Sequence, residues 1–261
     1  MSNKLTITII GSGTSQGVPV IACDCHVCTS TDVKDNRLRA SILVNYQNEN
    51  FVVDAGPDFR YQMLRAKVKS LRGVLFTHEH KDHIGGLDDV RAFNFRESRD
   101  MEVFCTKNVE SALHREYHYV FAEERYPGIP LININSIDLT PFELPSGLPV
   151  VPLRVMHYKM PVTAYRFFDF TYITDAKIIE DSEIVKMKGT KILVVNALRL
   201  AEHISHFNLK DALELIEKIK PEKAYLTHIS HLFGTHEEIQ ALLPENVFPA
   251  YDGLTIEMEV A

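Results

Sequence analysis

The chain has 261 residues, of which 45% are hydrophobic, so it is long enough to bury a sizeable core. Its formal net charge of −7 argues against a nucleic-acid partner, because such a surface needs clustered lysine and arginine. No apolar run approaches a membrane span, and the apolar stretch after residue 4 is shorter than the hydrophobic region of a signal peptide. We therefore expect a cytoplasmic protein with no membrane and no nucleic-acid polymer as partner.

The hydrophobic period and the glycine and proline positions predict strands with helices between them. We expect strands at residues 5–10, 40–46, 50–54, 73–77, 163–168, 170–174, 191–196, 223–227 and 254–259, with further strands in the stretch 131–155. We expect helices at residues 57–67, 86–96, 109–121, 209–219 and 235–243. This pattern predicts an α/β fold with two sheets and outer helices, as a single domain over residues 1–261.

Three histidines and one aspartate follow the buried strand predicted at residues 73–77. His78, His80, Asp82 and His83 fall within six positions there. Imidazole and carboxylate groups bind divalent transition metals, and a strand holds its end rigidly. His78 and His80 point the same way on an extended chain, whereas Asp82 and His83 come after the chain has turned and can face a second ion. We therefore predict a metal site here rather than an ordinary polar turn.

Three more candidate ligands lie where an apolar strand stops. His157 follows the apolar residues 150–156, Asp175 follows the strand at 170–174, and His228 follows the strand at 223–227. Each alone is typical of a turn residue, but together they repeat the arrangement of the first motif. A dinuclear site needs about six or seven protein ligands, so we predict that these residues complete it.

A second metal site is predicted near the N-terminus. Cys23, Cys25 and Cys28 form a C-x-C-x-x-C motif with His26 inside it. In a reducing cytosol such a cluster is more often a metal site than a disulfide, and it supplies three of the four ligands of a structural zinc. The fourth ligand comes from His26 or from elsewhere, and the alternative is a redox-sensitive loop without metal. We expect a small zinc-binding knob at about residues 19–31.

The order of these motifs resembles the metallo-β-lactamase superfamily. T-H-x-H-x-D-H, a distant histidine, a strand-end aspartate and a final histidine occur in that family's order over essentially the whole chain. The resemblance implies a four-layer αβ/βα sandwich of two mixed sheets with outer helices, and metals at the sheet edge. It implies that one metal is held by His78, His80 and His157, the other by Asp82, His83 and His228, with Asp175 bridging them. It also implies that Asp54 orients the metal loop without binding metal.

Residues 11–15 (GSGTS), the cysteine motif, residues 39–41 (RAS) and residues 227–231 (THISH) narrow the resemblance to the PhnP-type phosphodiesterases. That resemblance implies that His231 is the fourth zinc ligand, with His26 the less favoured choice. It also implies that His206 lies near the scissile phosphate and assists the leaving group, although His203 is close enough in sequence to compete for that role. With His206, we name Asp82 as a candidate catalytic residue.

The resemblance implies a metal-dependent phosphodiesterase that cleaves a small cyclic phosphate or nucleotide-like diester by metal-bound hydroxide. The expected cofactors are two divalent ions (Zn, Mn or Fe) and one structural zinc. A thioester or lactone hydrolase of the glyoxalase II type shares the ligand set and stays as the alternative. A non-catalytic, metal-stabilised binding module is a third reading, disfavoured because the ligand set is complete. The expected partner is a small-molecule phosphodiester, and the family often forms homodimers.

Overall fold

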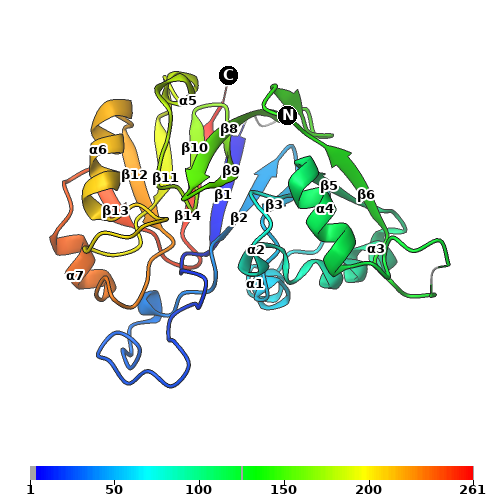
Figure 1. The fold of residues 1–261 in the computed structure, drawn as a ribbon, viewed down its shortest axis with the longest axis horizontal. Coiled ribbons are helices and arrows are strands. Elements are labelled where there is room, and N and C mark those ends of the chain that lie inside the picture. The colour runs from blue at the N-terminus through cyan, green and yellow to red at the C-terminus, as the bar shows by residue number, and fades with distance from the viewer. Residues whose placement is uncertain (1–3, 125, 261) are drawn as a thin grey trace. The chain divides into compact units, whose positions relative to one another are not determined.

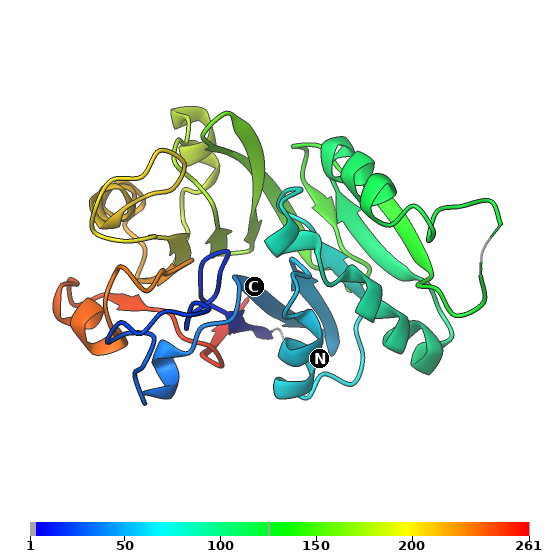
Figure 2. The same ribbon diagram turned by 60° about the horizontal axis from the view of Figure 1, so that its bottom comes forward.

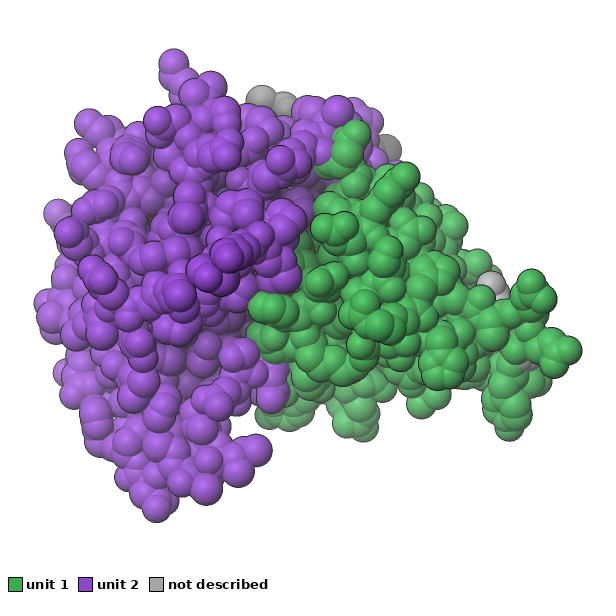
Figure 3. All heavy atoms as spheres, viewed as in Figure 1, with its two compact units in different colours: residues 1–10, 41–138, 255–261 green, residues 11–40, 139–254 purple. Residues whose placement is uncertain are grey.

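A computed structural model of the chain describes residues 4–124 and 126–260. The chain divides into two compact units (Figure 3), of which unit 1 contains residues 1–10, 41–138 and 255–261 and unit 2 contains residues 11–40 and 139–254. Each unit is built on one seven-stranded sheet. The two mixed sheets that the sequence predicts are thus present, while the single domain over residues 1–261 stays a prediction.

The sheet of unit 1 has the strand order β14-β1-β2-β3-β4-β5-β6. Its strands are β1 (Lys4–Gly11), β2 (Ser41–Tyr46), β3 (Glu49–Val53), β4 (Gly73–Leu75), β5 (Met101–Cys105), β6 (Ile132–Ser136) and β14 (Thr255–Glu259). β1 and β14, and also β2 and β3, pair antiparallel, whereas β3, β4, β5 and β6 run parallel (Figure 1). Because the parallel strands share their direction, their carboxyl ends meet at one edge of this sheet.

The helices of unit 1 are α1 (Phe59–Arg65), α2 (Lys81–Ile84), the 3-10 helix η2 (Leu87–Val90), α3 (Arg91–Glu97) and α4 (Lys107–Glu116). α4 lies against β6 (Figure 2). The helix predicted at 86–96 is divided into η2 and α3, and the helix predicted at 109–121 ends at Glu116. Buried Tyr117 follows it, and its hydroxyl donates to the carbonyl oxygen of Ile84 at 2.6 Å, so packing ends the helix there.

The sheet of unit 2 has the strand order β13-β12-β11-β10-β9-β8-β7. Its strands are β7 (Phe142–Glu143), β8 (Pro149–His157), β9 (Met160–Phe167), β10 (Phe170–Ile173), β11 (Ile192–Asn196), β12 (Lys223–Thr227) and β13 (Val247–Pro249). β7 to β10 form an antiparallel meander, and β10 to β13 run parallel (Figure 1). The predicted hairpin of residues 163–174 is confirmed as β9 and β10.

The helices of unit 2 are the 3-10 helix η1 (Val33–Asp35), α5 (Asp181–Lys186), α6 (Leu209–Ile219) and α7 (His236–Ala241). α6 has the predicted bounds and begins with a capping box, in which Asn208 and Asp211 satisfy each other's backbone N–H groups. It turns Ala212, Leu215 and Ile216 into the core of this unit and lies against β11. Residues 19–31, the predicted knob, form turns without helix or strand. Among the described residues, no helix has the length and apolar character needed to cross a membrane.

Candidate metal centres

The first group of candidate ligands follows β4 in unit 1. His78 lies three positions after Leu75, the last residue of β4, and Asp82 and His83 lie on the short helix α2. His78 and His83 are almost fully buried, at 1% exposed each, whereas Asp82 is partly buried and His80 is exposed. The ring centroid of His78 lies 4.1 Å from that of His83 and 4.8 Å from that of His80. The motif therefore gathers three imidazoles at the end of one parallel strand.

Asp54 lies behind these rings and is fully buried. Its Oδ1 accepts a hydrogen bond from the backbone N–H of Thr77 at 2.8 Å, and its Oδ2 accepts one from the Thr77 hydroxyl at 2.8 Å. Oδ2 also lies 2.7 Å from Nδ1 of His83. Burial raises the pKa of Asp54, while His83 and the hydrogen bonds from Thr77 oppose that rise. Asp54 thus connects Thr77, just before the first histidine, to His83 on α2.

The contacts of Asp54 and Thr77 decide which ring nitrogen of His78 and of His83 carries the lone pair. A carboxylate only accepts hydrogen bonds, so Nδ1 of His83 donates to Asp54 and Nε2 carries the lone pair. The Thr77 hydroxyl donates to Asp54, so it accepts from Nδ1 of His78, 2.9 Å away. Nε2 of His78 then also carries a lone pair. A carboxylate that prepares imidazoles in this way is the usual outer partner of a metal-binding histidine.

Two glycines allow the backbone around Asp54 to approach α2 closely. A Cβ on Gly56 would lie 2.0 Å from the carbonyl oxygen of Asp82, and a Cβ on Gly86 would lie 2.0 Å from the carbonyl oxygen of Gly56. The backbone N–H of Gly86 donates to Ala55 at 2.8 Å. Any side chain at these two positions would push the metal loop away from Asp54.

The second group of candidate ligands lies at the strand ends of unit 2. His157 is the last residue of β8, Asp175 follows β10 and His228 follows β12. Asp175 and His228 have φ angles of 56° and 57°, and Asp54 of unit 1 has 67°. Non-glycine residues rarely adopt this left-handed conformation, and it concentrates at functional sites. Asn196 holds the turn after Asp175, because its side chain bonds both the N–H (2.8 Å) and the carbonyl (3.0 Å) of Ala176.

Protein acceptors also orient the imidazoles of unit 2. Nδ1 of His157 donates to the backbone carbonyl of Ser205 at 2.7 Å, so its Nε2 carries the lone pair. His228 is 1% exposed, with Nδ1 3.3 Å from Oδ2 of Asp175 and Nε2 3.2 Å from the hydroxyl of Thr14. The glycine-rich residues 11–17 thus place a side chain against a strand-end ligand.

His206 lies in the same part of unit 2. It is 9% exposed, its Nδ1 is 3.6 Å from Oδ1 of Asp175, and its ring centroid is 4.4 Å from His157 and 4.7 Å from His228. Ligand atoms of His157, Asp175 and His206 all lie within 4.8 Å of one another. Burial, reinforced by the neighbouring His228, lowers the pKa of His206 to about 2. Its ring is therefore neutral near pH 7. A neutral ring can donate a hydrogen bond or bind a metal, whereas an imidazolium is needed to transfer a proton as an acid.

The structure separates His206 from its competitor His203. The ring centroids of the two lie 5.1 Å apart, but His203 is only partly buried, and its Nδ1 accepts from the backbone N–H of Ser205 at 3.3 Å. His206 is the one that lies beside Asp175. The sequence did not identify Thr77, Ser205 and Thr14 as supporting groups, although a threonine directly before the first histidine was a signal for the first of them.

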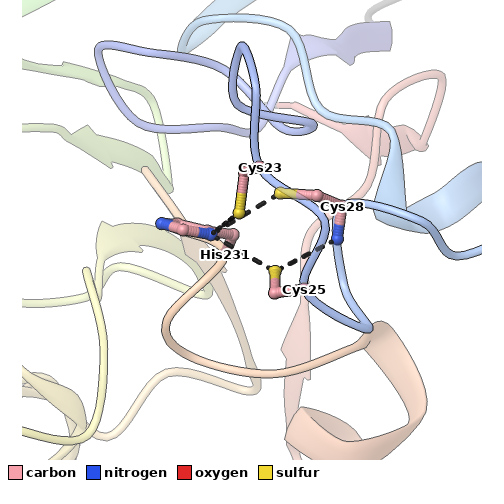
Figure 4. A group of neighbouring side chains, drawn as sticks. All are labelled: Cys23, Cys25, Cys28 and His231. Carbon is pink, nitrogen blue, oxygen red and sulfur yellow. Dashed lines mark hydrogen bonds between the residues drawn. The ribbon is translucent and has the colours of Figure 1, made fainter.

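The four residues of the predicted zinc site come together in unit 2 (Figure 4). Nδ1 of His231 lies 3.3 Å from Sγ of Cys23, 3.4 Å from Sγ of Cys25 and 3.5 Å from Sγ of Cys28. A tetrahedral zinc with ordinary Zn–S and Zn–N bonds places sulfur and nitrogen about 3.6 Å apart. Both the donor set and the spacing therefore fit a zinc ion.

The surroundings of the cysteines favour thiolate at one position. The backbone N–H of Cys28 donates to Sγ of Cys25 at 3.4 Å, and mainly for this reason the pKa of Cys25 falls to about 6. Burial raises the pKa of Cys28 to about 11. His26, the alternative fourth ligand, is exposed and instead pairs with Glu238, with Nε2 3.1 Å from Oε2. The structure thus places His231, and not His26, with the three sulfur atoms.

A family model described as a beta-lactamase superfamily domain matches residues 49–229. This span contains all the strand-end candidates of both units, while the cysteine cluster and His231 lie outside it. The family match therefore covers the strand-end candidates but not the cysteine cluster.

Two solved structures show the same fold. The chain is similar to a structure described as a new diphosphatase from the PhnP family, with 36% identity and a TM-score of 0.93, covering 100% of this chain and 99% of that one. It is also similar to Zn(2+)-bound PqqB from Methylobacterium extorquens, with 16% identity and a TM-score of 0.76, covering 96% and 99% of the two chains. At that identity the second likeness shows the fold alone. The predicted α/β fold class is confirmed.

A curated relative carries a different name. The protein called octanoyltransferase in Porphyromonas gingivalis is 39% identical over 250 residues, which make up 94% of this chain and 50% of that protein. This chain therefore spans about half the length of that relative, and the name describes the whole longer protein.

Proposed function

Because this chain belongs to the metallo-β-lactamase superfamily and to its PhnP-like branch, we propose that it is a metal-dependent hydrolase that cleaves a P–O bond in a small substrate. The observation that carries the proposal is the likeness over the full chain to a PhnP-family diphosphatase. A cyclic phosphodiester and a disubstituted diphosphate share the same reacting group. In both, the phosphorus that is attacked carries one negative charge and the leaving atom is an oxygen. The phosphodiesterase predicted from the sequence therefore extends to substituted diphosphates.

We propose that the strand-end ligands hold two divalent cations, which are zinc, manganese or iron. When bound, such cations lower the pKa of water and offset charge on the phosphoryl oxygens. The chain itself prepares its ligands, because Asp54 and Thr77 fix the tautomers of His78 and His83, and the carbonyl of Ser205 fixes that of His157. The proposed sets are those implied by the family resemblance, with Asp175 as the shared ligand.

We assign the leaving-group role to His206. Its lowered pKa leaves the ring neutral, so the role that fits is donation of a ring N–H to the departing oxygen rather than transfer from an imidazolium. Burial beside Asp175 supports His206 over His203 for this position. We propose that Asp82, the other catalytic candidate, would serve as a metal ligand; its Oδ2 lies 3.2 Å from Nε2 of His83.

The cysteine cluster is proposed as a structural zinc site. It connects the turns of residues 19–31 to His231, which lies three positions after the candidate ligand His228. A zinc ion held there would fix the loop that follows β12 and thereby the position of His228.

The name of the Porphyromonas relative favours one alternative. A protein that acts on octanoyl groups and shares 39% identity with this chain is consistent with an acyl thioester substrate for the same ligand set. The third reading, a binding module without turnover, predicts bound metal but no hydrolysis. As partners we propose a small phosphorylated molecule and a second copy of the chain in a homodimer, the latter tested by the mass of the protein in solution.

One assay distinguishes these readings. The protein is stripped of metal, reconstituted with Mn²⁺ or Zn²⁺, and given bis(p-nitrophenyl) phosphate, a nucleoside cyclic phosphate, a disubstituted diphosphate and an octanoyl thioester. We expect turnover of at least one phosphorus substrate, restored by metal, with ³¹P NMR identifying the bond cleaved. The His78→Gln variant should be inactive, while His114→Gln, on the exposed face of α4, is the matched control. Turnover of the thioester alone would replace the proposal with its alternative, and bound metal without turnover would support the binding module.

A further inference from the structure

Unit 1 has a pocket that contains none of the candidate ligands. It has a cavity volume of about 320 Å³ and is lined by residues of α1, the loop after it, η2 and α3. This volume is at the lower end of the range for small-molecule sites. The proposed hydrolytic function gives it no role.

The floor of the pocket is apolar. Phe59, Met63 and Phe93 form it and belong to the core of unit 1, with exposures of 1%, 6% and 8%. Leu64 lies at its edge and is 59% exposed, and Val68 is half-buried. A hydrated inorganic ion would gain nothing from such a floor, whereas an alkyl or aryl group gains roughly fourfold in affinity for each buried methylene.

The rim of the pocket is cationic. Arg60, Lys67, Lys69 and Arg96 line it, against the single acidic side chain of Asp89. All four cations are exposed, and in the described part of the chain none of them forms an ion pair. This excess is local, because the whole chain has a net charge of −7. Unpaired cations above an apolar floor complement a ligand with one anionic group and an apolar body.

We propose that the pocket between α1 and α3 binds a small anionic amphiphile, meaning one sulfonate, phosphate or carboxylate group on an apolar body of about eight to ten atoms. The apolar body lies against Phe59, Met63 and Phe93, and the anionic group faces Arg60, Lys67, Lys69 and Arg96. Neither part alone uses both surfaces, so both are needed for binding.

Calorimetry with three probes tests this assignment. 1-Octanesulfonate, kept below its micelle concentration, carries both parts, whereas methanesulfonate carries only the head and 1-octanol only the tail. We expect octanesulfonate to bind at least tenfold more tightly than either, to weaken as salt rises, and to shift the methyl NMR signal of Met63. If methanesulfonate bound as tightly as octanesulfonate, the apolar floor would have no role in binding. If octanol bound as tightly as octanesulfonate, the cationic rim would have no role. Binding to anionic vesicles without binding of monomeric octanesulfonate would overturn the pocket in favour of a membrane surface.

Variants assign the binding to this pocket. Lys67→Gln combined with Arg96→Gln should weaken octanesulfonate binding at least tenfold. The matched control, Lys107→Gln with Arg115→Gln on α4, removes the same charge from the same unit and should change binding less than twofold. Ala92→Trp fills the pocket from α3 without removing charge and should abolish binding. Unchanged affinity in both the charge variant and Ala92→Trp, with both folded by circular dichroism, would refute the proposal.

Discussion

Replacing Asp54 with Asn is the sharpest test of how the chain prepares its metal ligands. The amide oxygen can still accept from the Thr77 backbone N–H, as Oδ1 does at 2.8 Å. The amide NH₂ then takes the place of Oδ2, which accepts from the Thr77 hydroxyl at 2.8 Å and lies 2.7 Å from Nδ1 of His83. The Thr77 hydroxyl and the Nδ1–H of His83, which both donate toward this position, would then face the NH₂ group, which is also a donor. Because the backbone N–H of Thr77 cannot turn away, we expect the amide oxygen to stay with it and His83 to move its proton to Nε2, where it blocks metal binding.

The loss should appear in metal affinity more than in folding. An outer partner of one metal-binding histidine is typically worth about 10–100-fold in metal affinity. Asp54 holds His83 directly and His78 through Thr77, so we expect roughly 100-fold weaker binding. Two mismatched donors cost about 1–3 kcal/mol each, but removing a fully buried carboxylate, whose pKa burial raises, offsets part of that cost. The metal-free protein should therefore lose only about 1–3 kcal/mol of unfolding free energy.

Chelator-competition titration measures the affinity, and ¹⁵N NMR of the histidine rings reports the tautomers. The matched variant Thr77→Val removes only the hydroxyl link to His78 and should weaken binding about tenfold, leaving the proton of His83 on Nδ1. If the Asp54→Asn variant binds metal as tightly as the native chain and keeps that proton on Nδ1, the reasoning is wrong.

The remaining predictions concern the zinc knob, the leaving group and pH. The Cys25→Ser variant should release one zinc ion and lower the melting temperature by roughly 6–12 °C, since about 3 kcal/mol of metal-linked stability is lost. The control variant His26→Ala should keep its zinc. An unaltered zinc content in Cys25→Ser would count against the site. The His206→Ala variant should have a kcat lower by a factor of roughly 10²–10⁴ with its metal content intact, whereas the kcat of His203→Ala should lie within about tenfold of the native value. Loss of metal from the His206→Ala variant would instead make His206 a ligand. Burial lowers the pKa of His236 to about 4, below the unfolded value near 6.5, so the unfolded chain binds a proton that the folded chain does not. Urea unfolding should therefore show the full contribution of His236 to stability above pH 6.5, and a loss of up to about 1.4 kcal/mol of unfolding free energy per pH unit between 6.5 and 4. The His236→Gln variant should show a smaller slope. Equal slopes in the native and variant proteins would refute the argument.

Elements with a strong local signal were predicted with their bounds, and weak ones were not. α6 carries a long apolar face and a capping box, and β12 is an apolar run that ends at a histidine, so both match. α5 and β13 were missed, because six and three residues are too few for a period to emerge. β4 ends at Leu75 rather than Thr77, since the N–H of Thr77 bonds the side chain of Asp54 and not a neighbouring strand.

The sequence by itself determined the kinds of candidate ligand and their places after the ends of strands, because alternation and strand length are local properties that a few neighbouring residues fix. Only the tertiary structure decided which distant groups support them. The carbonyl of Ser205 orients His157 from 48 positions away, the hydroxyl of Thr14 contacts His228 from 214 positions away, and His206, rather than His203, lies beside Asp175. Such partnerships depend on how whole strands and loops pack, and no local pattern encodes them.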